Sequence, residues 1–303
     1  MINPVWKNKP YFSLDAYLQN IYGEKVYKIA LNAGFTCPNR DGTLGTRGCI
    51  FCSEGGSGDF SDSNVNEGLL RLKSKHTGQK YIAYFQAFTN TYGPAEKLYS
   101  IYSEALELNE IVGISIATRP DCLGDEILEV FKKLQRMFPH KFIWVELGLQ
   151  TIHEKTARYI RRGYDLACFE EATHKLGTLK IPVIVHLIIG LPGETDEMIL
   201  QSVTYLNQFS ISGVKLQLLH ILKNTDLHRE YLENPWKVYT LDEYCRLITR
   251  CLELLSPDIV IHRLTGDGPK DLLEAPLWSL DKRKVLNTIH KEMKLRNTYQ
   301  GRG

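Results

Sequence analysis

Three cysteines lie close together in one glycine-rich segment with the spacing C-x11-C-x2-C: Cys37, Cys49 and Cys52. Thiolates repel one another and are reactive unless a cation or a cluster holds them, so this spacing indicates a metal centre. Glycines at 34, 42, 45, 48, 55, 56 and 58 allow the backbone to wrap closely around such a group.

Two kinds of metal site compete for this segment. A structural zinc site needs four protein ligands, usually as two pairs, and the chain has no second C-x2-C or H-x3-H pair. Three cysteines that leave a fourth position open fit a [4Fe–4S] cluster with one iron free to bind a small chelating ligand. Cysteines without any ligand, in a flexible loop, are the third interpretation.

Length and composition set the frame for this chemistry. The chain has 303 residues, 37 basic and 35 acidic side chains, a formal net charge of +2 and 43% hydrophobic residues, which excludes disordered and fibrous classes. A chain of this length buries about three quarters of its unfolded surface, so it needs no metal for stability. A metal site is therefore expected to serve chemistry.

The cysteine count and the apolar stretches predict the compartment. Seven cysteines are an odd number without the density of a disulfide framework, and residues 1–10 contain no apolar signal core. The longest apolar stretch, 181–191, contains Pro182, His186 and Gly190 and is shorter than the roughly 18 residues of a membrane span. We expect a cytoplasmic protein with no membrane association.

Apolar runs that alternate with amphipathic segments predict the elements that position the cysteines. Runs rich in β-formers lie at 25–31, 81–88, 111–117, 142–149, 182–189 and 214–219, and helical periodicity marks 94–108, 124–137, 165–176 and 194–209. This alternation indicates a parallel sheet of βα units, so we predict an α/β fold with a partial (β/α)6 TIM-type barrel. Residues 25–222 would form the barrel, 1–24 an N-terminal extension, and 223–303 a C-terminal helical extension packed on it. Chemistry in such folds lies at the C-terminal ends of the strands.

At this point the sequence resembles a known family. The cysteine triad after the first strand, with the aromatic Phe51 before its last cysteine, is similar to that of the radical S-adenosylmethionine (radical SAM) superfamily. The wide spacing and the following Gly-Gly-x-x-Asp-Phe resemble the branch of the Elongator catalytic subunit, and more narrowly the YhcC/YtqA-type proteins with the MnmL tRNA-modifying group. The resemblance implies that Cys37, Cys49 and Cys52 bind a [4Fe–4S] cluster and that Phe51 lies against the cofactor.

The resemblance also implies contacts to S-adenosylmethionine (SAM). Gln86, near the end of the second run, and Asn90, just after it, stand where relatives carry Gly-Gly-Glu for the methionine amine. Gln150 corresponds to a glutamine that contacts the ribose, and Arg162 to an arginine for the methionine carboxylate. His186 falls at a position that often meets the ribose, although a histidine of the core is an equally open interpretation.

Two further stretches are candidates for the site at the ends of the strands. Residues 117–121 resemble the Glu-Thr-Arg-Pro-Asp of Elongator subunits, with Ala117 in place of the glutamate. Asp267 stands between two glycines after a short apolar run at 258–264, so it could face the mouth of the barrel.

The implied mechanism is reductive cleavage of SAM to a 5′-deoxyadenosyl radical that abstracts a hydrogen atom, with the electron from a donor such as flavodoxin or ferredoxin. Elongator-like relatives modify C5 of the tRNA wobble uridine, so tRNA is the expected partner. Because the sequence ends before an acetyltransferase domain, editing of an existing substituent is expected. A radical SAM enzyme for a small metabolite and a non-catalytic cysteine-metal protein are the alternatives, and no catalytic residue beyond the cofactor contacts is assigned.

Basic residues are concentrated near the end of the chain. Segment 281–303 contains seven basic and two acidic side chains, and could bind RNA or form a solvated helix. Lys7, Lys9, Arg40 and Arg47 are further candidates for an RNA-binding surface.

Overall fold

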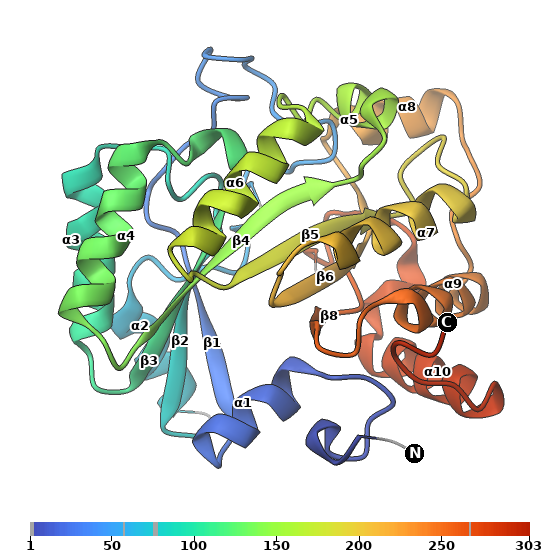
Figure 1. Ribbon diagram of the computed structural model, residues 1–303. Coiled ribbons are helices and arrows are strands. Elements are labelled where there is room, and N and C mark those ends of the chain that lie inside the picture. The colour runs from blue at the N-terminus through green and yellow to red at the C-terminus, as the bar shows by residue number, and fades with distance from the viewer. Residues whose placement is uncertain (1–2, 57, 75–77, 267) are drawn as a thin grey trace.

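The computed structural model describes residues 3–56, 58–74, 78–266 and 268–303. Its centre is a parallel sheet of seven strands, in the order β1-β2-β3-β4-β5-β6-β8, curled into a half-barrel (Figure 1). The strands are β1 (Val26–Leu31), β2 (Lys80–Phe85), β3 (Ile111–Thr118), β4 (Phe142–Gln150), β5 (Val183–Ile189), β6 (Gly213–Leu218) and β8 (Val260–Arg263). The predicted α/β fold with a partial barrel is confirmed.

The sheet has one strand more than the six predicted. The run at 258–264, which we expected in the C-terminal extension, contributes β8, and Val260 pairs with Gly213 of β6. A strand at the edge of a sheet leaves backbone groups unpaired, and β8 satisfies those of β6. Segment 223–303 thus contributes to the sheet as well as the helices α8 (Asp226–Glu233), α9 (Leu241–Leu254) and α10 (Lys282–Leu295).

Helices cover the outer face of the sheet (Figure 1). Strand residues such as Ile29, Phe85 and Val145 form one large apolar core with these helices. The helices are α2 (Val65–Lys73), α3 (Ala95–Glu107), α4 (Asp125–Met137), α6 (Leu166–Thr178), α7 (Asp196–Tyr205) and α9. Side-chain caps fix their starts: the Asp165 carboxylate accepts from the amide of Cys168 at 2.9 Å, and Thr240 with Glu243 forms a capping box.

The inner face of the barrel is built in layers, because alternate residues of every strand point inward. The lowest layer is apolar, with Val26, Ile82, Trp144 and Ile184 as its buried members. It packs against Leu18 of α1 (Leu14–Tyr22), which closes this end of the barrel. Two residues further along the strands the inward side chains are polar or charged, as at Lys28 and Glu146. The pocket described below lies above this charged layer.

The terminal segments meet at the closed end of the barrel. The Gln300 amide binds the backbone of Phe12 at 2.9 Å and of Ile259 at 2.8 Å, which joins both ends of the chain to β8. Helix α10 packs on α9, far from α5 (Glu154–Tyr159) and α8 at the other end of the molecule (Figure 1). Within the described ranges, every helix is too short or too polar to cross a membrane.

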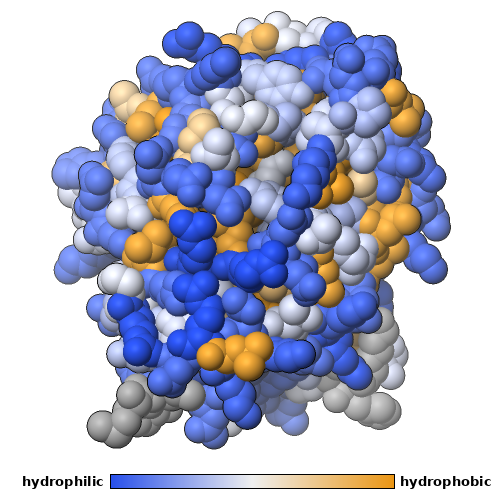
Figure 2. Space-filling model, turned by 90° about the vertical axis from the view of Figure 1, so that its right-hand side faces the viewer, coloured by the Kyte–Doolittle hydropathy of each residue, from blue (hydrophilic) through white to orange (hydrophobic). Residues whose placement is uncertain are grey.

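A second, two-stranded sheet lies beside the barrel. Strand β7 (Ile221–Leu222) pairs antiparallel with β9 (Leu273–Ala275), and α8 follows β7 directly. Figure 2 shows the side of the molecule to which α8, α9 and α10 belong, covered mainly by hydrophilic side chains with smaller hydrophobic areas between them.

Candidate functional site

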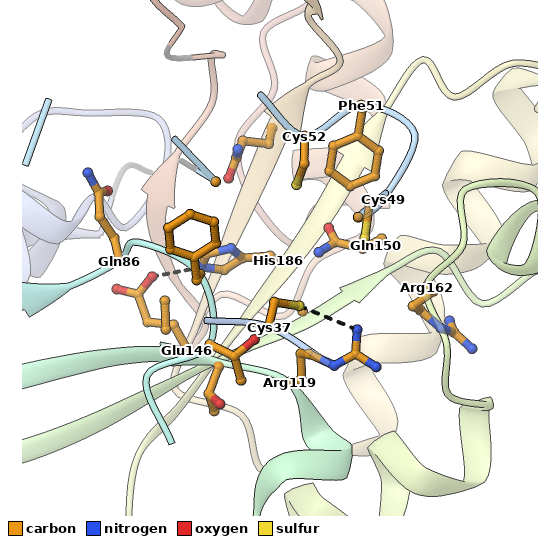
Figure 3. Close-up of a pocket in the computed structure, with 18 of the residues that line it drawn as sticks. Cys37, Cys49, Phe51, Cys52, Gln86, Arg119, Glu146, Gln150, Arg162 and His186 are labelled. Carbon is orange, nitrogen blue, oxygen red and sulfur yellow. Dashed lines mark hydrogen bonds and ion pairs between the residues drawn. The ribbon is translucent and has the colours of Figure 1, made fainter. Parts of the chain in front are cut away.

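A pocket opens where the strands of the barrel end, between the strand termini and the cysteine loop that joins β1 to α2 (Figure 3). It brings together residues that are far apart in the sequence. Eight of the residues predicted to contact the cluster or SAM line this pocket, and Asn90 does not: the eight are Cys37, Cys49, Phe51, Cys52, Gln86, Gln150, Arg162 and His186. Their individual contacts to the cofactors stay predictions.

The cysteine loop is held closed by its own polar groups. The amide of Arg40 donates to the carbonyl of Cys37 at 2.8 Å, and the amide of Gly48 donates to the carbonyl of Asn39 at 2.7 Å. The Arg40 guanidinium donates to the carbonyls of Cys52 and Ser53. Gly48 has φ +73°, and a Cβ there would lie 3.0 Å from the Arg40 side chain, so glycine suits this position. The loop therefore presents its thiols on a fixed frame.

The three thiols are free and have cations beside them. The hydrogen bond with Cys52 and a second one from Asn39 lower the pKa of Cys49 to about 7, although burial opposes this. The pKa of Cys52 is raised well above its usual value because its thiol shares this hydrogen bond and is buried. Nη1 of Arg119 lies 3.9 Å from Sγ of Cys37. Guanidinium groups near thiols favour the thiolate that a metal requires.

The donor set suits a cluster better than a single ion. No group of three or more His, Cys, Asp or Glu side chains among the described residues is arranged to hold one metal ion. In a [4Fe–4S] cluster each thiolate binds a different iron, so its cysteines stand farther apart than the ligands of one ion. Three free thiols around one pocket, with nearby cations, fit the cluster.

The end of β4 turns Gln150 toward the cysteines. Gln150 has φ +67°, an unusual backbone conformation for a residue with a side chain, and the pairing with β5 is irregular between Gly148 and Gln150. A Cβ at Gly148 would lie 2.8 Å from the Gln150 amide, so the glycine makes room for this side chain. Strained backbone of this kind is concentrated at functional sites. Figure 3 shows Gln150 on the same side of the pocket as Cys49.

Arg162 has protein partners for most of its guanidinium. It donates to the carbonyls of Tyr164, Leu149 and Thr151 at 2.7–3.1 Å and forms an ion pair with Glu154 at 2.9 Å. These contacts use four of the five N–H donors of an arginine, and in Figure 3 the group points away from the cysteines. The predicted contact with a methionine carboxylate would need the remaining donor or an exchange of partners.

Gln86 and Asn90, the two polar residues that follow β2, lie in different surroundings. Nε2 of Gln86 lies 3.4 Å from the Ser61 hydroxyl, at the opposite side of the pocket from Arg162 (Figure 3). Asn90 is fully buried and donates to the carbonyls of Ala87 and Ala117, so it holds the pocket wall from behind. Of the two, only Gln86 is among the pocket-lining residues.

A buried carboxylate at the floor of the pocket was not singled out from the sequence. Glu146 of β4 is 1% exposed and accepts hydrogen bonds from side chains on four other strands. Its partners are Lys28 of β1 at 2.9 Å, Ser115 of β3 at 2.6 Å, His186 of β5 at 2.7 Å and Lys215 of β6. Lys215 also donates to the Tyr84 hydroxyl of β2 at 2.8 Å. We call Lys28, Tyr84, Ser115, Glu146, His186 and Lys215 the charged layer; charged residues inside apolar runs were the sequence signal for it.

The charges in this layer perturb one another. Burial raises the pKa of Glu146, but Lys215, Lys28 and His186 outweigh it and hold the pKa well below its usual range. Burial lowers the pKa of Lys215, with partial compensation by Glu146. Burial and the charge of Lys215 lower the pKa of His186 to about 4, so the imidazole is neutral at pH 7. A neutral His186 that donates Nε2–H to Glu146 keeps Nδ1 as an acceptor.

The His186 environment predicts a loss of stability in mild acid. An unfolded histidine binds a proton below about pH 6.5, whereas His186 binds it only near pH 4, so the unfolded state is favoured between these values. The wild-type free energy of unfolding should fall by about 3 kcal/mol through this group between pH 7 and pH 4. In urea unfolding measured across this pH range, the free energy of unfolding of His186→Gln should fall correspondingly less than that of the wild type. If the two proteins lose the same free energy of unfolding, the lowered pKa of His186 is wrong. Burial is the main reason that the pKa of His262 is also lowered, so its own contribution stays largely the same in the variant.

Arg119, within the motif at 117–121, also belongs to the site although no role was predicted for it. Its guanidinium pairs with Asp121 at 2.7 Å, lies over the Tyr164 ring and approaches Cys37. The signal for it was the motif at 117–121. Asp267, the other candidate at the mouth, lies outside the described residues.

Comparison with known proteins identifies relatives of this chain. A family model described as the radical SAM superfamily matches residues 41–206, and a radical SAM C-terminal domain model matches residues 211–295. YtqA of Bacillus subtilis is 42% identical over 301 residues, which cover 97% of this chain and 92% of YtqA. A tRNA uridine(34) acetyltransferase of Methanocaldococcus jannaschii is 25% identical over 57% of this chain and 32% of its own.

The fold has a counterpart among solved structures. The Elp3 protein of Methanocaldococcus infernus, solved with an N-terminal deletion, superposes with a TM-score of 0.67 at 17% identity. The match covers 91% of this chain and 64% of that protein. At this identity the likeness concerns the fold.

Proposed function

Because the chain belongs to the radical SAM superfamily and, within it, to the YhcC/YtqA family of the Elongator-like branch, we propose that it modifies the C5 side chain of the tRNA wobble uridine. Enzymes of this superfamily use a [4Fe–4S] cluster and SAM, which are therefore the cofactors of this protein. When bound, the cluster supplies the electron that cleaves SAM reductively; a flavodoxin or ferredoxin is the proposed donor.

The pocket residues would divide the work of binding. Cys37, Cys49 and Cys52 would bind the cluster, because their thiols surround one cavity and lie beside cationic side chains. Gln150, at the end of β4, and His186, from the middle of β5, would orient the polar part of SAM. The observation that carries this arrangement is the convergence of the cysteine loop and these strand ends on a single pocket.

The choice of tRNA is supported by two observations. A relative that is 25% identical over 57% of this chain is named a tRNA uridine(34) acetyltransferase. The pocket is also lined by aromatic rings, Phe60, Phe88 and Tyr164 among them, and an unstacked RNA base is commonly held between such rings. A base that leaves the anticodon loop would enter at the cysteine loop, while the charged layer closes the floor.

Mass spectrometry of tRNA nucleosides tests the proposal. Cells that lack this protein should lose one modified wobble uridine and accumulate its precursor. Expression of the wild-type protein should restore the profile, and the matched variant Cys49→Ala, made at a similar level, should not. An unchanged nucleoside profile in the deletion strain would refute the tRNA assignment and leave radical chemistry on another substrate.

A further inference from the structure

Three arginines from separate parts of the chain converge on one carboxylate beside the pocket. Arg47 of the cysteine loop lies 2.7 Å from Asp226, and Arg161, which follows α5, lies 2.6 Å from the same oxygen. Arg229, in the first turn of α8, pairs with the other oxygen. We call Arg47, Arg161 and Arg229 the arginine trio.

The trio is held in place from beneath. The Asp226 side chain is only 11% exposed; burial raises its pKa, but the three guanidinium groups outweigh this and hold the pKa far below its usual range. The amide of Leu227 donates to the carbonyl of Ile50 at 2.9 Å, so α8 is tied to the cysteine loop. Asp226 therefore stays ionised and fixes the orientation of all three forks.

The trio carries more positive charge than its anchor neutralises. Three guanidinium groups and one carboxylate leave a net charge of +2. The side chains of Arg47 and Arg229 are 60% and 62% exposed. A guanidinium has five N–H donors, and each pair with Asp226 engages only one of its terminal nitrogens. Guanidinium groups that are already oriented and have free N–H donors can bind the oxygens of a phosphate. Because Asp226 holds these side chains in place, binding costs little side-chain conformational entropy.

The trio adjoins the pocket. Arg161 lies between Ile160 and Arg162, which both line the pocket, and its carbonyl accepts from the Asn39 amide at 2.6 Å. Arg47 directly precedes Gly48 and Cys49 of the pocket wall. A phosphate on the trio would therefore lie next to the entrance through which a nucleotide base reaches the thiols.

We propose that the arginine trio binds a backbone phosphate of the RNA whose base enters the pocket. This inference rests on the proposed function and names the surface that holds the substrate. It also places the RNA away from the basic segment 281–303, which the sequence analysis considered, because α10 lies at the opposite end of the molecule from α8 (Figure 1). Phosphate contacts position a nucleic acid without reading its sequence.

The test compares tRNA binding by variants that lose positive charge in the arginine trio with binding by a variant that loses it on α10, at the opposite end of the molecule. Arg47→Ala and Arg229→Ala should each weaken binding of unfractionated tRNA about tenfold at moderate salt, and the double variant further. Each loss of a phosphate contact should lower the slope of log Kd against log salt by about 1. The matched control, Arg283→Ala with Lys284→Ala on the exposed face of α10, should bind within about twofold of wild type.

The outcomes separate this inference from the proposed function. If the wild type binds tRNA and the trio variants bind with the same affinity and salt slope, the trio assignment is overturned and the proposed function stands. An equal loss of affinity in the α10 control would have the same consequence. Absence of salt-dependent tRNA binding by the wild type, together with an unchanged nucleoside profile, would overturn both. Arg229→Lys keeps the charge but loses the fork, and we expect an intermediate affinity. Thermal melting of every variant guards against unfolding, and a variant that melts normally but binds weakly supports the trio.

Discussion

Replacement of Cys49 by alanine is expected to abolish reductive cleavage of SAM by the anaerobically reconstituted protein. Loss of groups that merely support a metal ligand already costs 10–100-fold in affinity or activity, so the loss of a ligand should cost at least about a hundredfold. Iron and sulfide content should fall in parallel. Both are measured on the same preparation, by colorimetric assay and by chromatographic detection of the cleavage products.

The fold should survive this replacement. The cysteine loop is closed by contacts that do not involve the Cys49 side chain, such as the amide of Gly48 to the carbonyl of Asn39 and the Arg40 guanidinium to Ser53. Cys168→Ala is the matched control, because Cys168 is also a partly buried free cysteine but belongs to α6. Wild-type cleavage by Cys49→Ala would disprove the ligand assignment, and its wholesale unfolding would favour a structural metal site.

The second large effect is expected at Glu146. Glu146→Gln should lower the free energy of unfolding by about 3–5 kcal/mol, because it leaves the buried ammonium of Lys215 without its counter-charge. The Lys215 side chain is 3% exposed, so water cannot replace the carboxylate. Urea unfolding of the metal-free protein at pH 7 measures the change. Glu129→Gln, which removes an exposed pair with Lys132, should cost less than about 1 kcal/mol.

A double variant distinguishes an unpaired charge from a simple loss of packing. Lys215→Met removes the ammonium, so Glu146→Gln with Lys215→Met should be more stable than Glu146→Gln alone. The sign of the pH effect is also defined. The pKa of Glu146 is lowered in the folded state, so its ionised form stabilises the fold above the unfolded pKa. This stabilisation is lost as the pH falls from the unfolded pKa towards the lower folded pKa. If Glu146→Gln alone loses less than about 1 kcal/mol in the free energy of unfolding, the Glu146 carboxylate does not stabilise the charged layer.

Local patterns predicted much of the architecture. Alternation of apolar runs with helical periodicity predicted the strands β1 to β6 within a few residues, since burial against helices imposes apolar outer faces on them. The strand β8 was missed because it is four residues long and pairs with a strand distant in sequence. Residues such as Gln86 and Gln150 could be placed at one edge because parallel strands end together, whereas His186 lies in the middle of β5.

By itself, the sequence determined the chemistry that the site can support. The spacing of Cys37, Cys49 and Cys52 is a local property, and so is their position after the first strand. Only the tertiary structure decided which partner each charged group has. Glu146 collects side chains from four other strands, Arg162 is occupied by carbonyls at the end of β4, and Asp226 gathers the arginine trio at the entrance. Such pairings depend on distances across the barrel and on the desolvation that burial imposes, and neither quantity is encoded in the spacing of residues along the chain.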